Sequence, residues 1–410
     1  MATLKHNLAD RAREMFSARI RKSEVLHVMR IIGDQTLKKS AKKVNSCLLA
    51  LRKECGEKGC MVSAGPVHSL NASLEELVEA CKEWMENHRD ESTPEALLEL
   101  FFAAARYLLI ADLYGEDFVT QVQAGKNEVV VGQLCLDPGR LIDEGLKTGR
   151  AAALFSATLT PLEFYVAVLG GGKDCRRLRL PSPYKEENFC LLACDQISTR
   201  YRVRETSLPQ VAALLKELVR WKKGNYIAYF PSYQYMEQVQ KAFESQCPAI
   251  KTLTQHGGMT ELEREAFLTA FDQENDETLL GFCVLGGMFA EGVDLKGDRL
   301  IGTAIVGVGL PQINWELDLL REYYQRQNGK GYQFAYMYPG MNKVLQAAGR
   351  VIRGESDRGV VLLIDDRLTP KAYRELFPYH WRHCRVINGP EDLACRLRAF
   401  WSQSHDDSLT

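Results

Sequence analysis

A glutamine, a glycine and two arginines near the end of the chain stand at a spacing suited to binding phosphate. They form the sequence Gln346-Ala-Ala-Gly349-Arg350-Val-Ile-Arg353. We predict a helix here, on which residues three and four apart share one face, so that Gln346, Arg350 and Arg353 point together and Gly349 admits another backbone. Two guanidiniums on one face suit a polyanion such as a triphosphate. The alternative is that both arginines pair with surface carboxylates.

Three further groups of small or polar residues follow apolar runs, each of which predicts a strand. The groups are Ser156-Ala-Thr158, Ser232-Tyr233 and Glu291-Gly292-Val-Asp294. Hydroxyls and open backbone amides at strand ends can contact the phosphates of a nucleotide or of a DNA backbone. Taken singly, the Ser156 and Ser232 groups are more typical of plain turns.

The segments that must position these residues change character along the chain. Residues 8–55, 74–84 and 94–113 have the apolar spacing of amphipathic helices. From about Asn127, short apolar runs alternate with helical segments; the runs are EVVVGQLCL, AAALFSATL, NYIAYFPSY, LLGFCVLGG, RLIGTAIVGV, YQFAYMYP and GVVLLID. This alternation predicts an α/β fold with a mostly parallel sheet, whose ligands bind at the carboxyl ends of the strands.

Composition sets the class of protein but not its chemistry. The chain has 410 residues, 46% hydrophobic and 26% charged, which predicts two or three cores. It has no apolar run of about eighteen residues and no secretory signal, so we expect a cytoplasmic protein without a membrane partner. None of the twelve cysteines forms a C-x-x-C pair, which favours free thiols over metal ligands.

The net charge of -1 hides two oppositely charged segments. Residues 1–60 hold fourteen Lys or Arg against six Asp or Glu, whereas residues 61–120 hold three against twelve. Such charges are usually solvated helix faces. The cluster Lys38, Lys39, Lys42 and Lys43 is the part best suited to contact phosphate, and the acidic residues of 75–99 hint at a protein-interaction surface.

In their order, the motifs resemble motifs III to VI of superfamily 2 helicases of the XPD/DinG branch. The stretches LFSATLTPLEFYVAVLGG, QHGGMTELERE and YQFAYMYPGMNKVLQAAGRVIRGESDRGVVLLIDDR are similar to that branch, so the resemblance covers about residues 128–380. It implies a DNA-dependent ATPase that uses ATP and Mg²⁺ to translocate 5′-to-3′ on single-stranded DNA.

The resemblance also implies domains and roles for residues. Residues 1–125 would be a mostly helical arch, 126–169 the end of a first RecA-like motor domain, and 170–410 a second RecA-like motor domain. Arg350 and Arg353 would act on the γ-phosphate of ATP. The residues expected to line the ATP cleft are Gln346, Gly349, Glu291, Gly292 and Asp294; those expected to contact DNA are Ser156, Thr158, Ser232, Tyr233 and Tyr184.

The sequence departs from the family at its start. His6-Asn7-Leu8 looks like the continuation of a D-E-A-H-N-L sequence, but the acidic residues are missing, and no G-x-x-x-x-G-K-[ST] occurs anywhere. Gly171-Gly172-Lys173 is followed by Asp174 and is no substitute. An iron–sulfur cluster, where the family has one, would lie outside this chain.

Three functions therefore stay open. The chain could be part of an ATP-dependent DNA helicase, located in the cytoplasm with the nucleoid. It could be a DNA-binding fragment that cannot hydrolyse ATP, or a module that binds protein partners, not identified by the sequence, through its arch.

Overall fold

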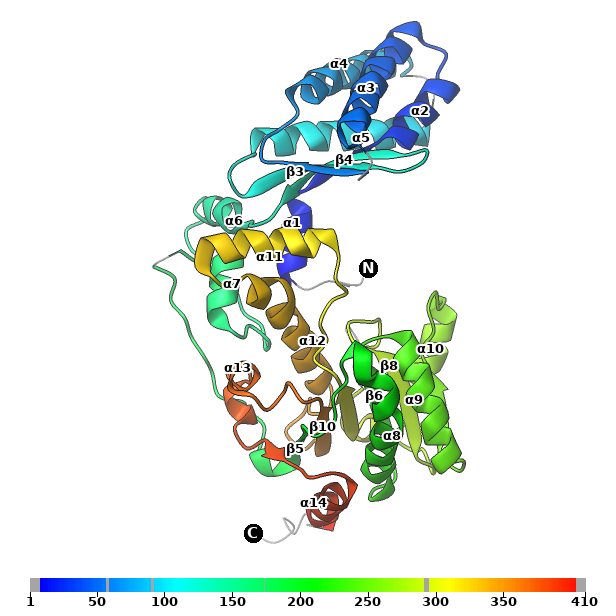
Figure 1. Ribbon diagram of the computed structural model, residues 1–410, viewed down its shortest axis with the longest axis vertical. Coiled ribbons are helices and arrows are strands. Elements are labelled where there is room, and N and C mark those ends of the chain that lie inside the picture. The colour runs from blue at the N-terminus through cyan, green and yellow to red at the C-terminus, as the bar shows by residue number, and fades with distance from the viewer. Residues whose placement is uncertain (1–7, 57–58, 90–91, 173, 291–294, 403–410) are drawn as a thin grey trace. The chain divides into compact units, whose positions relative to one another are not determined.

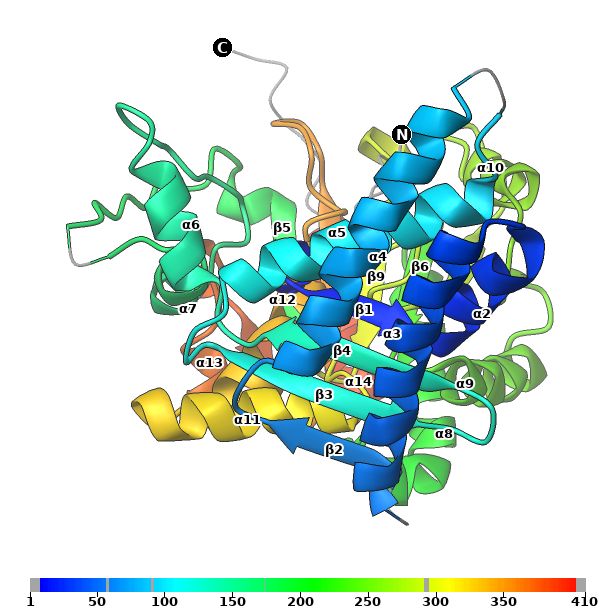
Figure 2. The ribbon, with the colours of Figure 1, turned by 90° about the horizontal axis from the view of Figure 1, so that it is seen from above.

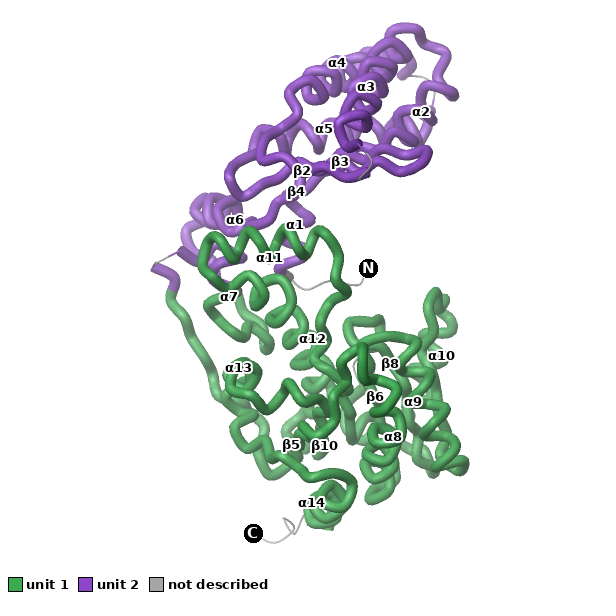
Figure 3. The backbone as a smooth tube through the Cα atoms, in the orientation of Figure 1, with its two compact units in different colours: residues 1–7, 154–164, 176–410 green, residues 8–153, 165–175 purple. Residues whose placement is uncertain are grey.

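The computed structural model describes residues 8–56, 59–89, 92–172, 174–290 and 295–402. Contacts divide the chain into two compact units, coloured in Figure 3. One contains residues 8–153 and 165–175, and the other contains residues 1–7, 154–164 and 176–410. We call them the N-terminal unit and the sheet unit. The domain limits that the sequence suggested, at residues 125 and 169, remain predictions.

The N-terminal unit combines helices with an antiparallel sheet, which has four strands among the described residues in the order β1-β4-β3-β2. The strands are β1 (Ala18–Arg21), β2 (Cys60–Ser63), β3 (Phe118–Ala124) and β4 (Val129–Cys135). The helices are α1 (Leu8–Met15), α2 (Lys22–Ile31), α3 (Gln35–Glu54), α4 (His68–Asn87), α5 (Glu95–Asp112) and α6 (Gly139–Leu146). Figures 1 and 2 show α3, α4 and α5 on one face of this sheet.

The helical pattern predicted for residues 8 to about 55 is confirmed by α1, α2 and α3 but was wrong at β1. In the sequence Ala-Arg-Ile-Arg, residues 18 and 20 are buried and residues 19 and 21 are exposed, and the segment pairs antiparallel with β4. Alternation with a period of two is the pattern of a half-buried strand. The run is too short to interrupt the helical period of its neighbours visibly.

The sheet unit is built on a parallel sheet that has seven strands in the described residues, in the order β11-β5-β10-β9-β6-β8-β7. The strands are β5 (Phe189–Cys194), β6 (Asn225–Phe230), β7 (Lys251–Thr254), β8 (Leu279–Val284), β9 (Gly302–Val306), β10 (Gly359–Ile364) and β11 (Arg385–Val386). The longer helices are α8 (Arg204–Arg220), α9 (Tyr233–Gln246), α10 (Glu261–Thr269), α11 (Trp315–Asn328), α12 (Tyr338–Ala348) and α14 (Pro390–Ser402). The shorter ones are α13 (Lys371–Arg374), the π-helix η5 (Gln333–Met337), and the 3₁₀ helices η2 (Glu186–Asn188), η3 (Tyr201–Val203), η4 (Gly297–Arg299) and η6 (Tyr379–Trp381). This sheet confirms the predicted α/β fold.

Helices cover the parallel sheet because its strands are apolar on both faces. Side chains of α8, α9 and α14 form one core with β6 and β10. At β8, the turn after α10 approaches so closely that a Cβ on Gly281 would lie 2.7 Å from Cζ of Phe271. The sheet is therefore a packed layer, and only its strand ends are available to position a site.

Two expected strands are absent from the described sheets. The run AAALFSATL is irregular and largely exposed, with Phe155 90% exposed. It has the composition of a buried strand, but no described strand pairs with it. The run YQFAYMYP is helical, from η5 into α12, and its residues 334–338 are buried. Complete burial hides the period that distinguishes a helix from a strand.

Helix α7 (Leu162–Val168) spans the division between the two units. Its first residues belong to the sheet unit, where the ring of Phe164 lies 5.1 Å from that of Phe334 and 5.3 Å from that of Tyr338, centroid to centroid. The segment carrying Ser156 and Thr158 thus joins the sheet unit through an aromatic cluster.

Candidate nucleotide and nucleic-acid site

The arginine motif begins on a helix but does not stay on it. Helix α12 ends at Ala348 and Gly349 caps it, so Gln346 lies in the last helical turn while Arg350 and Arg353 follow it. The predicted common helix face was therefore wrong for the two arginines. Glycine is a poor helix former, and the helix ends where it occurs.

Arg350 joins the motif to the loop that follows β8. Its Nε donates to the carbonyl oxygen of Ala290 at 3.3 Å. The same loop is held from the sheet, because the buried Tyr229 hydroxyl donates to the carbonyl of Phe289 at 2.9 Å. Ala290 directly precedes Glu291, Gly292 and Asp294, which lie outside the described residues. Two motifs about sixty residues apart in sequence thus meet at one strand end.

Arg353 is exposed, and its backbone is fixed by neighbours on both sides. One carboxylate oxygen of Asp357 accepts from the amides of Arg353 and Gly354, each at 2.8 Å. The Tyr184 hydroxyl donates to the carbonyl of Arg353 at 3.1 Å. The structure therefore brings Tyr184, which was expected to contact DNA, to the arginine motif.

Of Gly340 and Gly349, at the two ends of α12, Gly340 makes the closer backbone approach to another segment. A Cβ on Gly349 would meet only carbonyls of its own helix, the nearest at 3.2 Å, among the described residues. A Cβ on Gly340 would lie 2.7 Å from the carbonyl oxygen of Val308, in the loop after β9. The role predicted for Gly349 stays a prediction, and Gly340 is the position where a side chain would push α12 away from the loop after β9.

The remaining residues predicted to contact DNA lie in two places. Ser156 is exposed, and its hydroxyl accepts from the amide of Thr158 at 3.2 Å. Ser232, after β6, caps α9 by accepting from the amide of Tyr235 at 3.4 Å. Tyr233 is 38% exposed, so its ring is accessible. The Ser232 oxygen accepts in this helix cap, so its O–H remains able to donate to a phosphate.

Sequence reasoning missed a polar network along the same strand ends. Asp365, directly after β10, is fully buried; its carboxylate accepts from Nε of Arg367 at 2.7 Å and from Nη2 at 2.8 Å. The hydroxyl of Thr199, which follows β5, also donates to Asp365. Burial alone would raise the pKa of Asp365, but Arg367 and Thr199 hold it below its usual value.

Arg204 extends this network to β6. Its Nε donates to the carbonyl of Thr199 at 2.9 Å, its Nη1 lies 3.5 Å from the Ser232 hydroxyl, and the guanidinium packs over the ring of Tyr235. Arg204 and Arg367 are thereby fixed at the carboxyl edge of the sheet, where anions bind in parallel α/β domains. The signal in the sequence was an aspartate directly after the apolar run GVVLLI.

The basic cluster on α3 is partly neutralised within the N-terminal unit. Lys43 pairs with Glu76 of α4, so the basic and acidic segments meet. Lys39 and Lys42 are exposed and Lys38 is half-buried.

We expect replacement of Lys38, Lys39, Lys42 and Lys43 by Ala to lower the slope of log affinity for single-stranded DNA against log salt. Each true phosphate contact contributes about 0.7 to this slope. Lys43→Ala alone is the matched control, because Lys43 already has a carboxylate partner. A salt titration measured by fluorescence anisotropy gives the slopes, and an unchanged slope in the quadruple variant would show that these lysines are only solvated.

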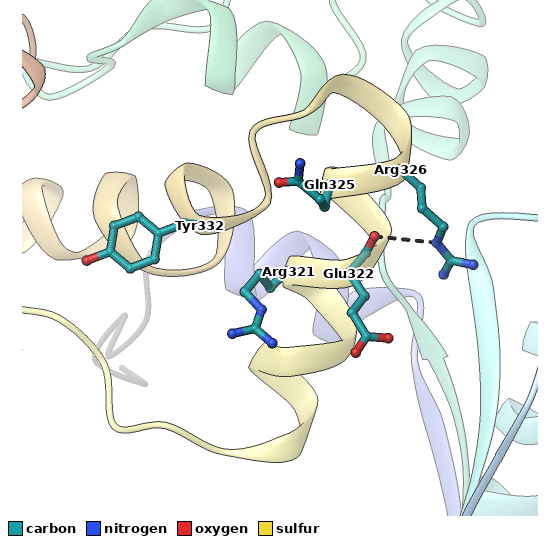
Figure 4. A pocket seen from close by; sticks show the side chains of 5 residues that line it. All are labelled: Arg321, Glu322, Gln325, Arg326 and Tyr332. Carbon is teal, nitrogen blue, oxygen red and sulfur yellow. Dashed lines mark hydrogen bonds between the residues drawn. The ribbon is translucent and has the colours of Figure 1, made fainter.

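The described residues hold no group of three or more His, Cys, Asp or Glu side chains that could bind a metal ion. None of the described helices is both long and apolar enough to cross a bilayer. A pocket of about 480 Å³ on the outer side of α11, shown in Figure 4, is lined by side chains of both charges.

The helicase C-terminal domain family matches residues 215–384, which carry most strands of the parallel sheet. This match and the parallel sheet with its helices support a RecA-like fold of the kind found in helicases.

The comparisons with individual proteins point to one branch of that class. The chain is 28% identical over 293 residues to the general transcription and DNA repair factor IIH helicase subunit XPD of Dictyostelium discoideum, covering 64% of this chain and 36% of the relative. It is 25% identical over 268 residues to the 3′-5′ exonuclease DinG of Bacillus subtilis, covering 62% and 28%. The chain thus spans about a third of the length of these curated relatives.

Solved structures agree at the level of the fold. The structure of S. tokodaii Xpd4 has a TM-score of 0.58 at 15% identity and covers 94% of this chain and 74% of that one. With these matches, the predicted resemblance to the C-terminal portion of an XPD/DinG-type superfamily 2 helicase is confirmed.

Proposed function

We propose that this chain is the C-terminal part of an ATP-dependent DNA helicase, with Arg350 and Arg353 acting on the γ-phosphate of ATP. The observation that carries the proposal is the hydrogen bond from Arg350 to Ala290, which joins the arginine motif to the segment of Glu291–Asp294. Arginines act on phosphoryl transfer mainly by stabilising charge in the transition state.

In the proposed enzyme, ATP and Mg²⁺ bind between this motor domain and an upstream one. Gln346, Gly349, Glu291, Gly292 and Asp294 line the cleft and couple the nucleotide state to closure of the domains, which moves single-stranded DNA 5′-to-3′. Ser156, Thr158, Ser232 and Tyr233 contact the DNA. A protein with this activity would be found in the cytoplasm with the nucleoid.

Tyr184 has a different proposed role from the one its sequence position suggested. Its hydroxyl donates to the carbonyl of Arg353, so we assign it to holding the arginine loop. Asp357 holds the same loop from the other side through two amides. Both act through Arg353 and are positioning residues.

On its own, the 410-residue chain is expected to bind single-stranded DNA without DNA-stimulated ATP hydrolysis. The P-loop lysine and the acidic pair supply much of the electrostatic stabilisation of phosphoryl transfer, and the sequence contains neither motif. Phosphate release with and without oligonucleotide tests the absence of ATP hydrolysis, and fluorescence anisotropy with the same oligonucleotide tests DNA binding. Turnover that follows the 410-residue species through a size-exclusion column, where a larger contaminating helicase would separate, would contradict the expectation.

The alternative of a protein-interaction module is favoured only by the acidic residues of α4 and α5, several of which are exposed. It predicts no binding to DNA in that same assay. The contact of Lys43 with Glu76 already uses part of this acidic surface within the chain.

A further inference from the structure

A second pocket, of about 280 Å³, is formed by residues that belong to none of the motifs. Arg374 comes from the end of α13, Tyr379 from η6 and Arg382 from the residue after η6, while Arg179 comes from the segment before β5. All lie in the sheet unit, so their arrangement belongs to one compact body. We call this site the arginine pocket.

The positive charge of the arginine pocket is not balanced by carboxylates. In the part of the chain that the structure describes, no Asp or Glu forms an ion pair within 4.0 Å with Arg179, Arg374 or Arg382. The one acidic residue that lines the pocket, Glu375, lies 3.7 Å from Lys371 instead. Three guanidiniums beside one already paired carboxylate make a local excess of positive charge.

Two of the arginines stack on aromatic rings instead of pairing with carboxylates. The guanidinium of Arg382 lies 4.0 Å from the ring centroid of Tyr379, and that of Arg374 lies 5.4 Å from the ring centroid of Phe377. A guanidinium stacked on a ring is oriented without using its in-plane N–H donors. Nη1 of Arg374 is buried and has no hydrogen-bond partner among the described residues. A buried donor without an acceptor indicates a site that an anion can complete.

The pocket on α11 gives a comparison, because its two arginines have partners on their own helix (Figure 4). There Arg321 lies 3.5 Å from the carboxylate of Asp318, and Nε of Arg326 donates to the carbonyl oxygen of Glu322 at 3.4 Å. Its arginines are engaged by the helix that carries them. Of these two pockets, the arginine pocket is therefore the one whose arginines have no carboxylate partner within the described residues.

We propose that the arginine pocket binds a phosphate group of single-stranded nucleic acid, outside the ATP cleft. Planar guanidiniums bind phosphate oxygens through paired N–H donors, and an exposed tyrosine beside them offers a surface for a base or sugar; Tyr379 is 55% exposed. The choice of nucleic acid over free phosphate rests on the proposed DNA-binding function. The phosphate chemistry itself rests on the arginines alone.

The test uses the double variant Arg179→Gln/Arg382→Gln, because both residues are exposed and neither belongs to the buried core. Arg220→Gln is the matched control: Arg220 also packs on an aromatic ring, at 5.3 Å from the centroid of Trp221, but it has a carboxylate partner in Glu217 at 3.4 Å. Affinity for an oligo-dT of about 16 nucleotides is measured by anisotropy over a range of salt concentrations.

We expect the double variant to bind the oligonucleotide at least about fivefold more weakly, with a salt slope reduced by about 0.7 for each lost phosphate contact. The control should keep the affinity and slope of the unsubstituted chain. A second arm measures binding of pyrophosphate by calorimetry, which should be lost in the double variant and kept in the control.

The outcomes separate this proposal from the proposed function. Equal oligonucleotide affinity and slope in chain and double variant would overturn the nucleic-acid assignment while leaving DNA binding elsewhere intact. Loss of pyrophosphate binding alone would identify a free phosphate as the ligand and overturn the nucleic-acid source. If the unsubstituted chain bound no DNA, both the proposed function and this source would fail. Pyrophosphate binding with the same affinity and stoichiometry in the double variant as in the unsubstituted chain would overturn the phosphate site itself.

Discussion

Arg353→Ala is expected to lower ATP turnover by about 10³-fold or more once the chain is joined to an upstream half that supplies a P-loop and an acidic pair. An arginine that reaches the γ-phosphate stabilises charge that develops mainly in the transition state, so its loss reduces kcat far more than DNA binding. The measurements are steady-state ATP hydrolysis at saturating oligonucleotide and anisotropy with the same oligonucleotide.

Arg353→Ala should leave the loop in place, because two hydrogen bonds hold the backbone of Arg353. The amide is bound by Asp357 and the carbonyl by Tyr184, and neither bond uses the side chain that Ala removes. Arg220→Ala, an exposed arginine paired with Glu217, serves as the control and should retain parental turnover. Near-parental hydrolysis by Arg353→Ala would remove this residue from the catalytic assignment.

The parallel sheet could be predicted because its strands are short apolar runs with polar or small residues at their carboxyl ends. GVVLLID and NYIAYFPSY became β10 and β6, both fully buried. YQFAYMYP has a similar apolar composition but is helical, running from η5 into α12. An apolar composition indicates that a segment is buried, but both strands and helices can be buried. The neighbouring elements therefore decide which of the two forms.

The members of the candidate site stay a prediction, and the local geometry at the arginines was predicted wrongly. The motif order pointed to Arg350 and to Glu291–Asp294, and the structure places Arg350 against Ala290, the residue before them. The spacing argument failed after Gly349, because helix periodicity applies only while the helix continues. Contacts between residues far apart in sequence, such as Tyr184 with Arg353, leave no local pattern to read.

Asp365→Asn is expected to destabilise the sheet unit by about 3–5 kcal/mol, because it leaves the mostly buried Arg367 without its charged partner. The carboxylate is fully buried and receives both arms of that guanidinium and the Thr199 hydroxyl. Glu375→Gln is the control, since the pair of Glu375 with Lys371 is exposed and such pairs contribute about 0–1 kcal/mol. Urea unfolding followed by tryptophan fluorescence reports mainly on this unit, which contains four of the five tryptophans.

The difference in the free energy of unfolding between Asp365→Asn and the unsubstituted chain should depend on pH. The folded-state pKa of Asp365 lies below its usual 3.8, so the unfolded chain binds the proton more readily and the carboxylate contributes stability above that pH. The gap between Asp365→Asn and the unsubstituted chain should therefore be constant through neutral pH and shrink as the pH falls through the folded-state pKa. A gap that stayed the same into strong acid would mean that the asparagine acts by altered packing and not by loss of charge.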